Sequence, residues 1–168
     1  MVVGDFEVDA LLDAEGSFAT YAEAFPEAGE ADWAPWRDRH PELFDGNRWL
    51  LPFRSYLIRG RGRTILVDTG VGPAGEGDFL PERGHLPGHM SVRVDDELVI
   101  LGDIAVHPAQ LARPELVYVS DGDADRSART REAVLTSYGD RILACGHFPG
   151  SGFGRLVDGL WTPLEVGG

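Results

Sequence analysis

Short apolar runs separated by glycine-containing turns fill most of this sequence, and they constrain its fold more than any other feature. The clearest pair is SYLIR at 55–59 and TILVD at 64–68, joined by the turn sequence GRGR. Glycine suits the tight turn of a β-hairpin, so this pair predicts two antiparallel strands. A second hairpin is predicted where SVRV and LVIL flank the acidic turn DDE. Further strands are predicted at 5–12, 116–119, 141–145 and 154–159.

One good helix follows Asp125. The segment SARTREAVLTSYG contains strong helix formers and ends at Gly139, a residue that can take the left-handed conformation at a helix C-terminus. Residues 17–45 are rich in Ala, Glu and Trp but are broken by three prolines, which predicts short helices and turns. The expected class is therefore α/β, with more strands than helices.

The composition fits one globular domain over 1–168, because 168 residues with 43% hydrophobic residues can bury a core of their own. The formal net charge of −13 argues against a nucleic-acid or anionic-membrane partner, since phosphate binding needs a basic surface. No run approaches the roughly 20 apolar residues that span a bilayer, and the N-terminus lacks the basic start of a secretory signal. We expect a cytoplasmic protein.

Cys145 is the only cysteine, so neither an internal disulfide nor a cysteine-rich zinc site can form within the chain. It lies on a predicted apolar strand, where we expect an inert core thiol. The two basic runs, from Arg54 to Arg63 and from Arg126 to Arg131, predict solvated faces.

Two literal motif matches fail for lack of context. The glycine pattern at 70–75 follows a strand but opens no helix, so it predicts a turn and not a dinucleotide site. The acidic residues from Asp121 to Glu132 have calcium-loop spacing, but Arg126 stands where that loop needs glycine. We expect these acids to cap the N-terminus of the helix.

Polar motifs that could carry chemistry follow several of the predicted strands. They are Asp68 in VDTG, His85 and His89 in GHLPGH, Asp103 in LGD and His147 in CGHFPG. These motifs, in this order, resemble those of the metallo-β-lactamase-fold metallohydrolase family, and the resemblance spans most of the chain. It implies a metallo-β-lactamase-type αββα sandwich.

The family's central His-x-His-x-Asp-His segment is absent, because none of the five histidines has another two positions away. We therefore expect an abbreviated member of the family, a single domain truncated internally, with the join at about 75–88. This range overlaps a stretch rich in glycine and proline at 70–84. The lost segment should leave apolar surface or a strand edge exposed, and a homodimer is the simplest replacement for the lost cover.

The resemblance also implies roles for particular residues. His85, Asp103 and His147 take ligand positions, whereas Asp68 and His89 would orient the ligands from behind. In the family the acid at Asp103 bridges two metals; here the lost segment leaves ligands for one zinc ion at most. Fe²⁺ or Mn²⁺ would suit the same donors. Three protein ligands leave a position for a water of lowered pKa.

The expected function is hydrolysis of a small ester, lactone or thioester, with Asp103 as the catalytic residue. Two alternatives stay open: a metal-free, non-catalytic module for binding or dimerisation, and a deletion product without a settled function. The aromatic N-terminal region either packs beneath a loop-rich cap or closes over a substrate mouth. His107 is expected to be structural, and His40 is expected at the surface.

Overall fold

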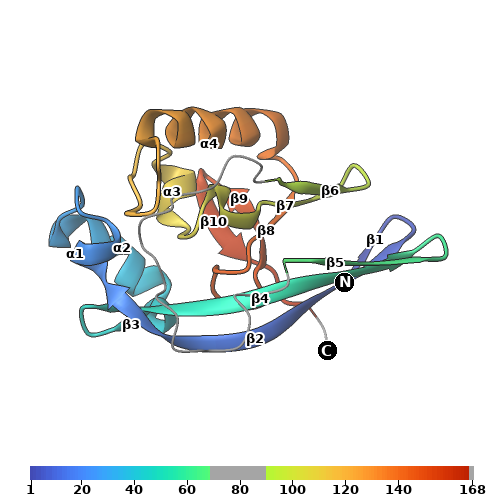
Figure 1. Cartoon of the computed structure of the whole chain (residues 1–168), viewed down its shortest axis with the longest axis horizontal. Helices are drawn as coiled ribbons and strands as arrows, with labels where there is room; N and C mark the ends of the chain where they lie inside the picture. The colour runs from blue at the N-terminus through green and yellow to red at the C-terminus, as the bar shows by residue number, and fades with distance from the viewer. Residues whose placement is uncertain (69–89, 167–168) are drawn as a thin grey trace.

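The computed structural model describes residues 1–68 and 90–166, which form two β-sheets packed face to face (Figure 1). Sheet A has the strand order β1-β2-β4-β3, and β5 also pairs with β4. All of these pairs are antiparallel. The strands are β1 (Val2–Val3), β2 (Phe6–Thr20), β3 (Phe44–Asp45), β4 (Arg48–Gly60) and β5 (Arg63–Val67). The predicted GRGR hairpin is thus confirmed, although β2 and β4 extend well beyond the runs that predicted them.

Sheet B has the order β10-β9-β8-β7-β6. Among its described strands only β7 and β8 are parallel, with Leu98 opposite Ile142. The strands are β6 (Val92–Val94), β7 (Leu98–Ile100), β8 (Ile142–Ala144), β9 (Phe153–Val157) and β10 (Leu160–Pro163). The strand predicted at 116–119 is wrong. That segment is irregular because its backbone bonds to side chains and not to a neighbouring strand. The side chains of Gln110 and Arg131 both donate to the carbonyl oxygen of Leu116.

Helices cover the outer side of sheet B and one end of sheet A (Figure 1). The helical elements are α1 (Tyr21–Ala24), α2 (Glu30–Arg39), η1 (Pro41–Leu43), η2 (Gly102–Ile104), α3 (Ala109–Ala112) and α4 (Ala124–Tyr138). As predicted, an acid caps α4, because the Asp123 carboxylate accepts from the N–H of Arg126 at 2.9 Å. The left-handed cap expected at Gly139 is wrong: its φ of −64° is right-handed, and its N–H bonds the Leu135 carbonyl.

Three apolar clusters hold the layers together. Val8, Tyr56 and Ile58 of sheet A pack between the sheets against residues of sheet B that include Val94 and Ile100. A second cluster lies between sheet B and the α3–α4 side. The third is aromatic and joins α1 and α2 to sheet A and to residues 106–118. In Figure 1 no described helix lies over the outer face of sheet A along β2, β4 and β5.

Candidate active site

The parallel pairing of β7 and β8 brings two of the predicted ligands to one edge of sheet B. Asp103 lies in η2 directly beyond β7, and His147 lies in the loop beyond β8. Parallel neighbours end at the same edge, so residues that follow them meet there. Gly102 has a φ of +60°, which lets the chain turn sharply between the strand and Asp103.

The two side chains are in contact. Nε2 of His147 lies 3.2 Å from Oδ1 of Asp103, and Nδ1 lies 2.8 Å from the carbonyl oxygen of Pro52. A carbonyl oxygen only accepts hydrogen bonds, so Nδ1 carries a proton and Nε2 faces the carboxylate. The side chain of His147 is 15% exposed and that of Asp103 is 41% exposed. The pair therefore opens to solvent on the Asp103 side.

Arg54 on β4 fixes the loop that carries His147. Its guanidinium donates to the carbonyl oxygens of Gly146 at 3.2 Å, Phe148 at 2.8 Å and Gly150 at 2.6 Å. A Cβ at Gly146 would lie 2.8 Å from the Arg54 carbonyl oxygen, so only glycine allows this approach. The solvated face predicted for this arginine is wrong, because its guanidinium is partly buried and donates to three carbonyl groups of the loop.

Two buried side chains fix the Asp103 turn. The Cys145 thiol lies 3.0 Å from the Ala105 carbonyl oxygen, and burial raises its pKa, as expected of an inert core thiol. Arg131 donates to the Ile104 carbonyl at 3.2 Å and pairs with Asp121 at 3.1 Å, with neither side chain exposed. Arg131 was expected on a solvated face, and this prediction is wrong. Its burial is possible because a carboxylate and backbone carbonyls surround the guanidinium.

Electrostatics within the site favour a protonated imidazole when no cation is bound. Burial lowers the pKa of His147, but the hydrogen bond to Asp103 and the charge of that carboxylate raise it, and the net pKa is raised. The carboxylate of Asp68, just beyond β5, acts in the same direction. Asp68 thus lies close enough to influence the pair, and its orienting role stays a prediction.

The donor atoms fit a zinc site in part. Zinc takes a neutral imidazole nitrogen whose other ring nitrogen is fixed by a hydrogen bond, together with a carboxylate. His147 and Asp103 provide these groups. His85 and His89, and the join expected at 75–88, lie outside the described residues. Over 1–68 and 90–166, no three His, Cys, Asp or Glu side chains form a group that could hold an ion by itself.

His107 lies apart from the pair, fully buried among aromatic rings that include Trp33 and Trp49. Its Nδ1 accepts from the N–H of Ala109 at 3.1 Å, and its Nε2 lies 3.4 Å from the Tyr21 hydroxyl. Burial lowers the pKa of His107 to about 3. This packing agrees with the structural role expected for it. It also shows that the aromatic N-terminal region forms core.

His40 was expected at the surface, but it is buried, and that prediction is wrong. His40 follows the last residue of α2, and its imidazole ring packs against the rings of Trp36 and Trp161. The adjacent proline and polar residues suggested a surface turn. Contact with β10, which is far away in the sequence, was not visible in that local pattern.

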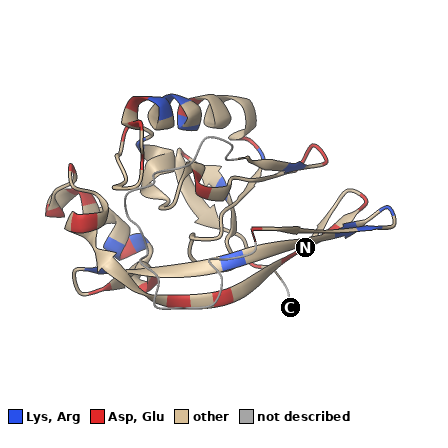
Figure 2. Ribbon diagram, in the orientation of Figure 1, with Lys and Arg blue, Asp and Glu red and all other residues tan. Residues whose placement is uncertain are grey.

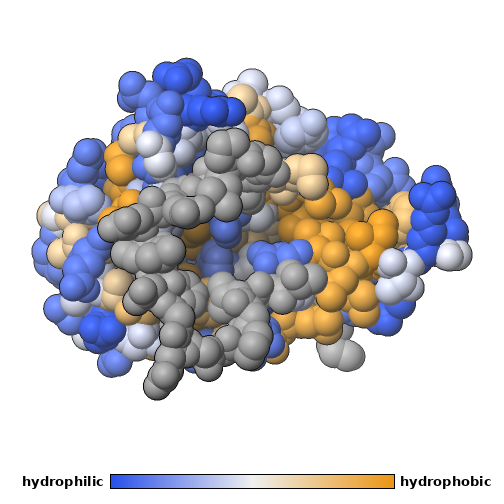
Figure 3. All heavy atoms as spheres, in the orientation of Figure 1, coloured by the Kyte–Doolittle hydropathy of each residue, from blue (hydrophilic) through white to orange (hydrophobic). Residues whose placement is uncertain are grey.

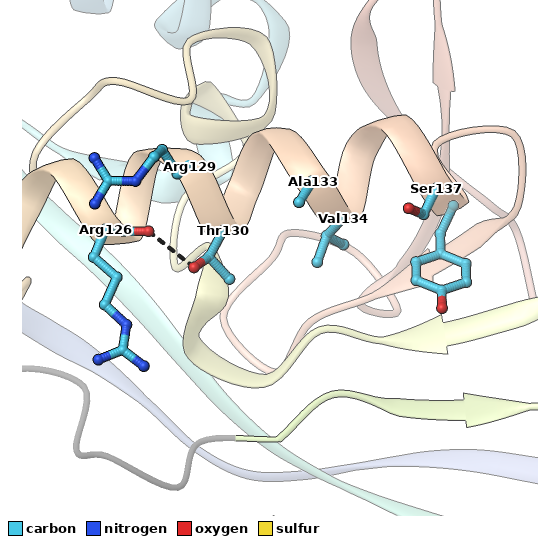
Figure 4. A pocket seen from close by; sticks show the side chains of 7 residues that line it. Arg126, Arg129, Thr130, Ala133, Val134 and Ser137 are labelled. Atoms are coloured by element: carbon cyan, nitrogen blue, oxygen red, sulfur yellow. Dashed lines mark hydrogen bonds between the residues drawn. The ribbon is translucent and has the colours of Figure 1, made fainter.

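In the part of the chain that the structure describes, two cavities lie away from the Asp103–His147 pair. A groove of about 370 Å³ follows one face of α4 (Figure 4), and its lining includes Arg126, Arg129 and Tyr138. A cavity of about 360 Å³ lies beside β2, lined mainly by apolar side chains but also by Arg54. Arg54 therefore links this second cavity to the His147 loop.

No protein-family model matches the sequence, and no curated protein matches it. Solved structures do match. The hydrolase AbOPH of the beta-lactamase superfamily superposes with a TM-score of 0.78 at 15% identity, over 100% of this chain and 97% of that chain. The dizinc quorum-quenching lactonase AidC superposes with a TM-score of 0.74 at 11% identity, with the same coverage.

A probable metal-dependent hydrolase from Staphylococcus aureus superposes with a TM-score of 0.64 at 11% identity, over 88% of this chain and 91% of that chain. Identities this low establish the fold alone. The metallo-β-lactamase-type fold expected from the sequence is thereby confirmed. Separately, no helix in the described part of the chain is long and apolar enough to cross a membrane.

Proposed function

We propose that this chain, which has the metallo-β-lactamase fold, is a zinc-dependent hydrolase of a small ester, lactone or thioester. The observation that carries the proposal is the contact between His147 and Asp103 at 3.2 Å, together with the hydrogen bond from Nδ1 of the imidazole to the Pro52 carbonyl oxygen. A histidine bonded in this way through Nδ1 presents Nε2 for a metal.

In this proposal one zinc ion is held by Nε2 of His147, by the Asp103 carboxylate and by His85. When bound, zinc supplies Lewis-acid polarisation of a carbonyl group and lowers the pKa of a coordinated water to near neutrality. The structure supports the first two ligands by their contact. Asp68, whose charge reaches His147, would keep the ligands oriented.

Asp103 is the residue proposed to move the proton. Its carboxylate is the more exposed partner, so a substrate carbonyl can approach it from solvent. As water attacks the carbonyl carbon, the Asp103 carboxylate takes the proton and then delivers it to the leaving oxygen or sulfur.

Similar structures give the proposal its reaction class. One is a lactonase with two zinc ions and another is described as metal-dependent. We propose one ion for this chain because its sequence lacks the central segment that carries further histidines. A cytoplasmic location, expected from the sequence, stays a prediction.

The test is metal stoichiometry by native mass spectrometry after equilibration with zinc, followed by assays with esters, lactones and thioesters. We expect one ion per wild-type chain and none in His147→Ala. Asp103→Asn should lower hydrolysis by about 10² to 10⁴-fold, the range typical of a lost general base or acid. Asp96→Asn is the matched control, because Asp96 is an exposed acid in the β6–β7 turn.

A folded wild-type chain that retains no zinc would overturn the proposal and favour the metal-free binding module. A chain without a cooperative thermal transition would favour the deletion product instead. If the chain retained zinc but hydrolysed no ester, lactone or thioester, it would be a metal-binding protein, and the proposed hydrolase activity would be excluded.

A further inference from the structure

The cavity beside β2 contains a positive charge that no carboxylate of the described chain neutralises. Its lining includes Arg54, which is partly buried. The guanidinium donates to carbonyl oxygens, and a carbonyl group accepts hydrogen bonds without carrying a full charge. Burial lowers the pKa of Arg54, and the charge of Glu15 has a smaller, opposite influence. Within residues 1–68 and 90–166, Arg54 forms no ion pair.

Part of the guanidinium is free to bind a ligand. Nη1 uses both of its N–H groups, for the carbonyl oxygens of Gly146 and Phe148, and Nη2 uses one, for that of Gly150. The remaining N–H of Nη2 and the N–H of Nε have no acceptor in the described part of the chain. Gly150 also lines the cavity, and its bond to Nη2 is exposed. Two N–H groups on one guanidinium match the two oxygens of a carboxylate.

Apolar side chains of β2 continue the lining from Arg54. Val8, Ala10 and Leu12 alternate along the strand and therefore lie on one face of it. Leu12 is opposite Arg54 in the β2–β4 pairing, so the guanidinium belongs to the same face. Val8 and Phe153 belong to the core between the sheets, whereas Leu12 is 57% exposed. The apolar lining thus extends from the core to solvent.

The other polar side chains of the lining are already engaged. Asp9 points to the opposite face of β2 and pairs with Arg59. Figure 2 shows acidic positions of β2 next to basic positions of β4. The Ser151 hydroxyl donates to the carbonyl oxygen of Leu164 at 3.0 Å. Among the described side chains of the lining, Arg54 is therefore the group that can select a ligand by charge.

A concave shape distinguishes this cavity from the other apolar surface of the molecule. Figure 3 shows hydrophobic residues gathered over the region of β5 and β6, on the outside of the sandwich. The cavity beside β2 instead encloses about 360 Å³. Ligand pockets range from roughly 300 to 1,000 Å³ and combine apolar walls with a few polar groups that orient the ligand. A volume near the lower limit suits a small ligand.

We propose that this cavity binds a small alkyl carboxylate. The carboxylate accepts hydrogen bonds from Nε and Nη2 of Arg54, and the alkyl chain lies against Val8, Ala10 and Phe153. The site is separate from the Asp103–His147 pair, and the binding involves no covalent step. Because Arg54 also holds the His147 loop, a bound carboxylate should stabilise the folded chain, as any ligand specific for the folded state does.

The first experiment is calorimetric titration of the full chain with octanoate and with octanamide, its neutral counterpart. We expect one octanoate per chain with a dissociation constant below about 1 mM. Octanamide should bind at least about tenfold more weakly, because hydrogen bonds to a charged group are the stronger ones. A thermal melt should shift upwards with octanoate. Titrations with zinc and with a chelator should agree, since this site needs no metal.

The second experiment fills the cavity without touching Arg54. Ala10→Leu adds apolar volume to the lining and should weaken octanoate binding by at least about tenfold, because the alkyl chain loses its place. Ala14→Leu is the matched control: Ala14 is an exposed residue of the same strand outside the lining, and binding should be unchanged. A circular dichroism melt shows that each variant folds.

Arg54→Lys tests the paired donors, because lysine keeps the charge but not the planar pair of N–H groups. It should weaken octanoate binding and leave octanamide binding unchanged. This variant also loses bonds to the His147 loop, so the neutral amide and Ala10→Leu decide the proposal. The absence of saturable octanoate binding, equal affinity for octanamide, or binding that survives Ala10→Leu would overturn it. None of these results would bear on zinc binding, which native mass spectrometry measures separately.

Discussion

The two ends of the sandwich bury apolar side chains in opposite ways. At the α1–α2 end, aromatic rings from sheet A and the helices enclose His107, and Trp33 and Trp49 are fully buried. At the β5 end, apolar residues of comparable hydrophobicity stay half exposed. Helices cover one end, and no described helix covers the other. Stability should therefore depend more on the aromatic end than on the β5 end.

The largest effect should follow from opening the aromatic end. Trp49→Ala removes a ring that contacts Phe25, Tyr118 and His107, and we expect a loss of about 3–5 kcal/mol in the free energy of unfolding. Urea denaturation measures it. Leu12→Ala, at an exposed position, is the control and should cost less than about 1 kcal/mol. Equal losses in both variants would contradict the comparison.

The second largest effect should be a loss of stability at the aromatic end when the pH is lowered. The pKa of buried His107 is lowered to about 3 from an ordinary value of 6.5. Between these values the unfolded chain binds a proton that the folded chain does not, so this group's contribution falls as pH falls from 6.5 towards 3. At about 1.4 kcal/mol per pH unit, the loss from pH 6.5 to 4.5 is about 2–3 kcal/mol.

Urea denaturation of wild type and His107→Gln over this pH range measures that contribution. The variant is expected to be less stable at neutral pH but to have a shallower dependence on pH. Parallel curves for the two proteins would show that His107 is not the titrating group.

A smaller effect is expected between the two ends, where the His147 loop lies on β4. Gly146→Ala places a Cβ 2.8 Å from the Arg54 carbonyl oxygen, and the backbone must shift. We expect about 1–3 kcal/mol of destabilisation and weaker zinc binding, both measured on one sample by denaturation and titration. Gly16→Ala, which meets nothing within 4 Å, should leave both unchanged.

The smallest effect on stability should come from the β5 end. Leu66→Thr keeps a residue suited to a strand and removes apolar surface that is already half exposed. Within the monomer we expect a change below about 0.5 kcal/mol. Thermal melts at low protein concentration test this. A large loss would mean that the Leu66 side chain contributes more to the folded monomer than its exposure indicates.

Local patterns predicted most strands and the best helix. The β4–β5 and β6–β7 hairpins follow from apolar runs with turn residues between them, and α4 follows from its helix formers and its acidic cap. The same patterns failed at 116–119, where an apolar run is irregular because its carbonyl groups bond to Arg131 and Gln110. The strand propensity of a segment does not reveal whether side chains from other parts of the chain will hydrogen-bond to its backbone.

The candidate site was predicted only as a set of residues. Asp103 and His147 could be identified by motif, but Arg54, Arg131 and the Pro52 carbonyl could not, since an arginine in a charged run and a backbone oxygen give no local signal. His40 was missed for a related reason, because the partner that buries it comes from β10.

The sequence by itself determined the strand-rich pattern, the order of the polar motifs after the strands and the acidic balance of charge. The strand pattern and the order of the motifs follow from residues that are close in the sequence, and the charge balance follows from composition. Only the tertiary structure decided that Asp103 meets His147, because this depends on the parallel pairing of β7 with β8 across a helical connection. It also decided which apolar residues were enclosed, since Trp49 and Leu66 both lie in apolar runs of the sequence, yet Trp49 is buried and Leu66 is half exposed.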